Sequence, residues 1–190
     1  VQTETIERYV REGKLIPDLV VPMSEHRTFK YFKEETLQKY AEQYGWTLID
    51  DSNRKDMFMD MIRQMDMSYS YKPVLIKAIL LCADDKGHIK LDDVVAYFKS
   101  YYEGRRAAGL PVEKENSIFA KGGYTDKEAE RNILSNPFKR FEDMQMLRHT
   151  KTLGIMQIDE AVWKRLGNDE KAEIEKICDT KLDNYYARFG

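Results

Sequence analysis

The sequence predicts a mainly α fold with minor β, organised as two consecutive units. Apolar residues recur at helical spacing through most of the 190 residues, which is the main signal for helices. Two stretches, 19–32 and 145–159, instead form short extended runs around a turn, which is typical of β-hairpins. A polar, turn-rich segment after the first unit indicates a linker. We therefore expect a first unit at 1–49, a linker at 50–56 and a second domain at 57–190.

The composition is that of a globular protein and limits what the chain binds. Hydrophobic residues make up 42% and charged residues 34%, with a formal net charge of −2. A DNA-binding domain usually has a basic surface, so any nucleic-acid contact must come from local patches. The longest apolar run, 73–83, is interrupted by Lys77 and is too short to span a bilayer, so we expect no membrane partner.

The number and spacing of the cysteines and histidines indicate a reducing compartment and argue against a metal site. Cys82 and Cys178 are far apart in the sequence and lie on apolar helical faces. Two buried thiols fit a reducing environment, so we expect a cytoplasmic protein without disulfides. The histidines, His26, His88 and His149, are not spaced as a ligand pair, and we expect neither a metal nor another cofactor.

In the first unit we expect a helix over 3–13, an extended hairpin over 19–32 and a helix over 34–44. Ile6 begins an apolar stripe at i, i+3 and i+4, which must pack on another helix. Gly13 is suited to end the first helix in a left-handed conformation. Helix, helix, hairpin, helix is the order of a winged helix, and both units show a similar order, so we expect the first unit to be winged helix-turn-helix-like.

The second unit is expected to be mostly helical, with a small amount of strand. Its hairpin turns near Leu153 and Gly154, so this unit contains a β-hairpin wing as well. Thr125 and Glu128 form a capping box at the start of one helix. The expected helices are 55–65, 70–84, 91–109, 125–136, 137–144, 160–166 and 169–189, with a tight turn into a very short strand at 85–90.

Two segments of the first unit carry a resemblance to a known family. "TIERYVREGKLIP" ends a helix with the pattern Tyr-x-x-x-Gly-x-Leu, and "RTFKYFKEETL" joins an extended wing to a helix with an acidic start. Together they resemble the MerR and excisionase class of winged helix-turn-helix domains over about residues 2–44. In that class another helix precedes the first segment, and it is missing here. We therefore expect this chain to be a fragment of a larger protein.

The resemblance implies that the first helix enters the major groove of double-stranded DNA and that the wing contacts phosphates. The residues so implied are Thr3, Thr5, Arg8 and Arg11 on the helix, and Arg27 and Lys30 on the wing. Glu7 departs from the pattern, because the MerR branch usually has arginine there and phosphate repels a carboxylate. The opposing interpretation is a small helix–hairpin–helix scaffold without a role in DNA binding.

The second unit resembles a different group of proteins. A Tyr-x-x-Pro-x-Leu helix, a "YY-x-x-R" helix and an "NP-x-x-x-F" turn follow one another over about residues 57–190. In this order they are similar to a helical region near the C-terminus of bacterial helicase-like and restriction-type proteins. The resemblance implies an accessory domain beside a motor or nuclease. A Gly-x-x-x-x-Gly-Lys phosphate-binding loop does not occur in the sequence.

A basic cluster in the second unit supports DNA binding as well. Its members lie on a short helix and on the first hairpin strand: Lys139, Arg140, Arg148 and Lys151, with His149. Lysine and arginine on a wing are suited to phosphate. A solvated charged face, half neutralised by Glu142 and Asp143, is the alternative. Strict alternation places Arg148 and Lys151 on opposite strand faces, so we predict that the strand ends or bulges near Thr150 and frees Lys151 into solvent.

These patterns favour a non-catalytic DNA-binding module within a larger bacterial DNA-processing or defence protein. Paired acids such as Asp92 and Asp93 are ordinary at a helix start, and no nucleophile set is evident, so we do not expect an enzyme. The alternative is a protein-interaction or dimerisation module, including a homodimer. It is motivated by the near-neutral charge and by an apolar stripe on the last helix, which could pack within its own unit or on a partner: Ile174, Ile177, Cys178 and Leu182.

Overall fold

The computed structural model describes residues 3–24 and 27–189, without the side chains of Thr3, Glu4 and Arg27. Helices make up 58% and strands 12%, in two small antiparallel sheets, which confirms the predicted mainly α fold with minor β. The chain divides into two compact units, Val1–Asp50 and Asp51–Gly190. Among the described residues, no helix is both long and apolar enough to cross a membrane.

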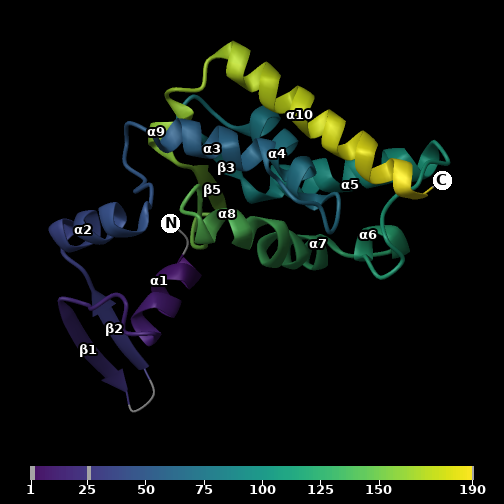
Figure 1. The fold of residues 1–190 in the computed structure, drawn as a ribbon. Coiled ribbons are helices and arrows are strands. Elements are labelled where there is room, and N and C mark those ends of the chain that lie inside the picture. Colours follow the sequence, from purple (N-terminus) through teal and green to yellow (C-terminus); the bar gives the residue numbers. More distant parts are fainter. Residues whose placement is uncertain (1–2, 25–26, 190) are drawn as a thin grey trace. The chain divides into compact units, whose positions relative to one another are not determined.

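Unit 1 has the expected order of helix, hairpin and helix (Figure 1). Its elements are α1 (Thr3–Arg11), β1 (Leu19–Ser24), β2 (Arg27–Tyr31) and α2 (Glu34–Tyr44). The second helix has the bounds that the sequence predicts. The first ends two residues earlier than expected, and Gly13 beyond it has a φ of +69°, as its proposed role in stopping the helix requires.

The core of unit 1 is small and mostly aromatic. Leu15 and Ala41 are the buried apolar residues among those described in this unit. Around them Tyr9, Tyr44 and Trp46 form a cluster with ring centroids 4.9–5.2 Å apart. The Tyr44 hydroxyl also donates a hydrogen bond to the Lys14 carbonyl (3.0 Å). Aromatic edge and face contacts therefore join α1 to α2 where few aliphatic side chains are available.

Unit 2 is larger and holds an extensive buried core. Its helices are α3 (Arg54–Arg63), α4 (Tyr71–Cys82), α5 (Leu91–Ala107), α6 (Ile118–Lys121), α7 (Asp126–Ile133), α8 (Lys139–Asp143), α9 (Glu160–Trp163) and α10 (Asn168–Tyr186), with a π-type segment at Leu134–Phe138 and a 3-10 turn at Ala187–Phe189. Because α3 begins at Arg54, the last three residues of the expected linker are helical. The Thr125–Glu128 capping box is present in full.

The predicted hairpin of unit 2 belongs to a three-stranded sheet. Strands β4 (Leu147–Thr150) and β5 (Ile155–Ile158) pair with Leu147 opposite Ile158. The short strand β3 (His88–Lys90) pairs antiparallel with the other edge of β5, which gives the order β3-β5-β4. The central strand therefore has a neighbour on both sides, and the hairpin is anchored to the segment that precedes α5.

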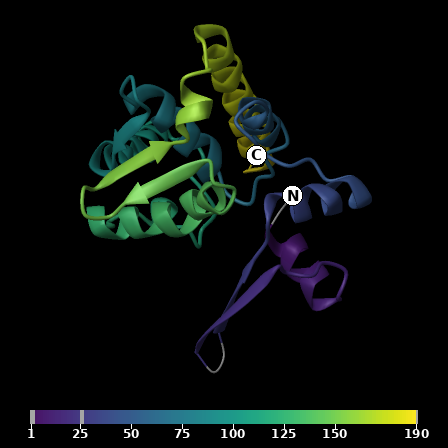
Figure 2. The same cartoon turned by 90° about the vertical axis from the view of Figure 1, so that its left-hand side faces the viewer.

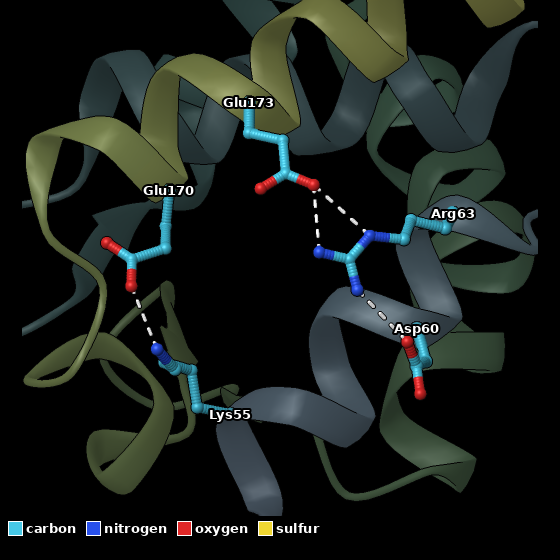
Figure 3. Close-up of polar contacts among 5 residues, drawn as sticks. All are labelled: Lys55, Asp60, Arg63, Glu170 and Glu173. Carbon is cyan, nitrogen blue, oxygen red and sulfur yellow. Dashed lines mark hydrogen bonds and ion pairs between the residues drawn. The ribbon is translucent and has the colours of Figure 1, made fainter.

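The apolar stripe on the last helix packs within unit 2. Ile174 and Cys178 are fully buried, Leu182 is 5% exposed, and Ile177 packs against the same core. Ion pairs fix the helix from outside: Lys55 binds Glu170 and Arg63 binds Glu173, each at 2.8 Å (Figure 3). The stripe is thus part of the core of this unit: of the two roles that the sequence allowed it, packing at home or on a partner, the structure shows the first.

Gly87, in the turn before β3, should tolerate no larger residue. Its φ is +77°, and an added Cβ would lie 2.6 Å from Ile158 Cγ2 and 2.9 Å from Trp163 Cγ. We expect Gly87→Ala to lower the free energy of unfolding by about 3 kcal/mol, from left-handed strain plus overpacking. Gly154→Ala is the control, because its φ is +61° but its surroundings are open, so about 1 kcal/mol is expected. Urea unfolding followed by circular dichroism measures both, and equal costs would contradict the contact argument.

Candidate nucleic-acid interface

Helix α1 presents two arginines to solvent. Arg8 and Arg11 are exposed and three residues apart, so they lie on one side of the helix, whereas Thr5 is half-buried. The Arg8 guanidinium lies 5.4 Å from the centroid of the Tyr9 ring. Glu7 is exposed on the same helix. The Thr3 side chain, implied by the family resemblance to contact DNA, lies outside the described residues.

The two-stranded ribbon, β1–β2, carries the expected wing cations. Lys30 is exposed and pairs across the ribbon with Val20, so these two side chains share one face. Arg27 begins β2, but its side chain lies outside the described residues. Residues 1–50 hold seven Lys or Arg and nine Asp or Glu. Unit 1 is therefore not basic as a whole, and its cations act as separate local charges.

Asp18 fixes the start of the ribbon to helix α2, a role that sequence reasoning missed. Its Oδ2 accepts the Lys33 backbone N–H (2.7 Å) and its Oδ1 accepts the Thr36 hydroxyl (2.9 Å). The Lys33 hydrogen bond is the main cause that lowers the pKa of Asp18. The partners lie 15 and 18 residues downstream, so no local sequence pattern announces this contact.

One member of the basic cluster of unit 2, Lys139, is paired with two carboxylates. Lys139 Nζ lies 2.7 Å from Asp143 and 3.0 Å from Glu142. Hydrogen bonds to these two side chains raise the pKa of Lys139. Arg140 is exposed; the pKa of Asp66 is lowered mainly by a hydrogen bond from Lys72, and the charge of Arg140 adds to this. At Lys139, therefore, the structure agrees with the alternative interpretation, a solvated charged face in which carboxylates neutralise the cations.

The end of β4 is where the sequence predicted it. The strand stops at Thr150, and the Leu153 N–H donates to the Thr150 carbonyl (3.0 Å) across the turn. Leu147 is buried and Arg148 exposed, as alternation requires, and Lys151 is exposed in the turn. The predicted release of Lys151 into solvent is confirmed. His149 is half-buried, and its Nε2 is buried without a hydrogen-bond partner among the described residues.

Arg148 lines an open cleft of about 470 Å³ next to three carboxylates. The cleft is lined by Asp51, Arg148, Gln157, Ile158, Asp159, Glu160, Ala161 and Lys164. Asp159 also pairs with Arg54 (3.4 Å), and Glu160 with Lys164 (2.6 Å). A phosphate approaching Arg148 would meet these carboxylates, so Lys151 is the better placed of the two hairpin cations.

The chain was also compared with known families, proteins and structures. No family model, no curated protein and no solved structure matches the chain. The resemblances to MerR-type domains and to helicase-associated regions therefore stay predictions. Within residues 3–24 and 27–189, no three His, Cys, Asp or Glu side chains gather as metal ligands.

Removal of the Asp18 carboxylate should loosen the junction between the ribbon and α2. We expect Asp18→Ala to speed amide exchange at Lys33, because this N–H loses its acceptor. In the unchanged chain the protection should be present at neutral pH and lost as pH falls below the ordinary value of 3.8, since folding lowers this pKa. Glu42→Gln, exposed on the same helix, is the control. Unaltered Lys33 exchange in Asp18→Ala would refute the role of Asp18.

Proposed function

We propose that this chain is a non-catalytic DNA-binding module and that unit 1 makes its main contacts with double-stranded DNA. One observation carries the proposal: Arg8 and Arg11 are exposed on the same side of α1, in a unit whose ribbon adds Lys30. Arginine is suited to this role because its planar guanidinium binds phosphate or guanine through two hydrogen bonds.

The charge distribution sets the character of the proposed binding. Phosphate contacts release counterions, so affinity falls steeply with salt in proportion to the number of contacts. Unit 1 offers few such cations, and Glu7 beside them opposes phosphate. Binding by this chain alone should therefore be modest and easily reversed by salt.

The proposed setting follows from the second resemblance. A helical accessory unit of the kind found beside bacterial motors and nucleases would place this DNA contact within a DNA-processing or defence protein. Cys82 and Cys178 are both free thiols, which fits the reducing cytoplasm.

Neutralising the α1 arginines should weaken DNA binding. We expect Arg8→Gln/Arg11→Gln to lower affinity for duplex DNA about tenfold at ~0.1 M salt and to reduce the log–log salt slope by about 1 to 2, as the loss of two phosphate contacts requires. Fluorescence anisotropy across a salt series measures both quantities. Folding should be preserved, because exposed charges contribute little to stability.

The control for this experiment removes the same charge elsewhere. Lys39 on α2 and Lys176 on α10 are both exposed, so Lys39→Gln/Lys176→Gln matches the net charge change. The control should bind DNA as the unchanged chain does. An equal loss in both double variants would show that net charge, and not α1, governs binding; no binding by the unchanged chain at low salt would refute the proposed function.

Charge reversal on the second hairpin should have a smaller effect. We expect Arg148→Glu/Lys151→Glu to weaken binding about threefold for every DNA sequence alike, because phosphate contacts carry no base information. The effect is smaller than at α1 since Arg148 already has carboxylate neighbours. The same anisotropy titration on two unrelated duplexes is the measurement. Unchanged affinity would make this hairpin a purely structural element.

A further inference from the structure

The three-stranded sheet of unit 2 has two chemically different faces. Its inner face belongs to the core, with Ile89 at 1% and Met156 at 0% exposed. Residues adjacent to these along each strand lie on the opposite face, and directly paired residues share a face. We call this opposite side the outer face; its first row is His88, Gln157 and Arg148, and its second row is Lys90, Ile155 and Thr150.

The outer face is basic and open within unit 2. Three of its six residues are His, Lys or Arg, and none is Asp or Glu. Lys90 and Arg148 are exposed, and Lys151 is exposed in the turn directly beyond the second row. Figure 2 shows β4 and β5 in front of the helices of this unit, which lie behind the sheet. The register is internal to unit 2, so this arrangement does not depend on unit 1.

The exposed cations of this surface have no carboxylate partner. No ion pair joins Lys90, Arg148 or Lys151 to an acidic side chain within residues 3–24 and 27–189. His88 differs, because its Nδ1 lies 3.4 Å from Asp84. Their positive charge is therefore available to an anion, most freely at the end of the sheet that carries Lys90 and Lys151.

Carboxylates close to these cations in the sequence are engaged elsewhere. The two that follow β5 are paired with Arg54 (3.4 Å) and Lys164 (2.6 Å). At the start of α5, Asp92 lines a groove between α5 and α7. Burial, and then the charge of Asp93, raise the pKa of Cys82 on α4, so this second carboxylate lies near α4. Neither acidic residue of α5 belongs to the outer face.

We propose that the outer face is a second surface for the phosphate backbone of duplex DNA, an inference that rests on the proposed function and extends it to unit 2. Strands are about 4.8 Å apart and residues rise about 3.3 Å along them, so the α carbons of Lys90 and Arg148 lie about 12 Å apart. DNA carries a phosphate about every 3.4 Å of axis on each strand, so both side chains reach one strand within a few nucleotides.

The composition of the outer face also determines what it recognises. It has no Phe, Tyr or Trp on which a base could stack, and the Thr150 hydroxyl adds a donor suited to phosphate. Contact is therefore with the backbone and independent of base sequence. An acidic protein segment would be attracted by the same charges; DNA is favoured because α1 of the same chain presents Arg8 and Arg11 to that ligand.

Two neutralised lysines test the outer face on the full 190-residue chain. We expect Lys90→Gln/Lys151→Gln to weaken duplex binding about threefold at ~0.1 M salt and to reduce the log–log salt slope by about 1. The same loss should occur in the Arg8→Gln/Arg11→Gln background, because the two surfaces bind separate phosphates. Fluorescence anisotropy across a salt series measures both quantities.

The matched control removes two charges from unit 2 outside the sheet. Lys121 and Lys127 are exposed, and Lys121→Gln/Lys127→Gln should leave affinity and slope close to those of the unchanged chain. Equal losses in the two lysine pairs, or none in either while the α1 variant weakens binding, would overturn the outer face and leave the proposed function standing. No DNA binding by the unchanged chain at low salt would refute the proposed function itself.

Two further measurements identify the ligand and guard against misfolding of a variant. When duplex DNA is added to the unchanged chain, NMR shift changes should appear at Lys90 and over 148–155, fade with added salt, and be small over 121–127. Shift changes confined to unit 1 would overturn the proposal. Binding of polyglutamate that requires Lys90, together with unaltered DNA affinity in Lys90→Gln/Lys151→Gln, would show that the partner is an acidic protein and overturn DNA as the ligand.

Discussion

The buried carboxylate of Glu113 is the constraint on which unit 2 depends. It is 6% exposed and accepts hydrogen bonds from the Ser70 N–H (2.8 Å), the Ser70 hydroxyl (2.5 Å) and the Tyr185 hydroxyl. The Ser70 oxygen is in turn bonded to the Tyr102 hydroxyl (2.7 Å). Burying a carboxylate costs several kcal/mol unless its oxygens are satisfied. The start of α4, the C-terminal half of α5 and the end of α10 must therefore meet at the loop that carries Glu113.

Around this point the rest of unit 2 is arranged by apolar packing and by ion pairs at its surface. Helix α10 buries its inner stripe against the core and is paired with α3 through Glu170 and Glu173 and with α4 through Lys77 and Asp179. Exposed pairs of this kind contribute little energy each. Their main effect is to fix the position of α10 along α3 and α4. The Tyr185 hydroxyl reaches Glu113 only when α10 is held in this position.

Much of the fold was readable from local patterns. The bounds of 34–44, the Thr125–Glu128 capping box and the strand end at Thr150 each depend on residues within a few positions of one another. Glu113 was not readable, because it lies in a charged run typical of a solvated loop, and its partners Ser70 and Tyr185 are 43 and 72 residues away. The role of Asp18 could not be predicted for the same reason, because its partners Lys33 and Thr36 are also distant in the sequence. In the candidate site, the i+3 and i+4 spacing to Glu142 and Asp143 did indicate the pairing of Lys139.

The unequal burial of the two units has a consequence for how each responds to a ligand. The free energy of local opening follows buried apolar contact, so unit 1, with its small aromatic core, should open far more often than unit 2. A molecule that binds only the folded form adds RT ln(1 + [L]/Kd) to the stability of the unit it binds. Such a gain would be a large fraction of the small free energy of unfolding of unit 1. It would be a minor fraction of the larger free energy of unfolding of unit 2. Because Trp46 lies in unit 1 and Trp163 in unit 2, the chain has a separate fluorophore in each, and occupancy of unit 1 should appear as a delayed melting of the Trp46 signal alone.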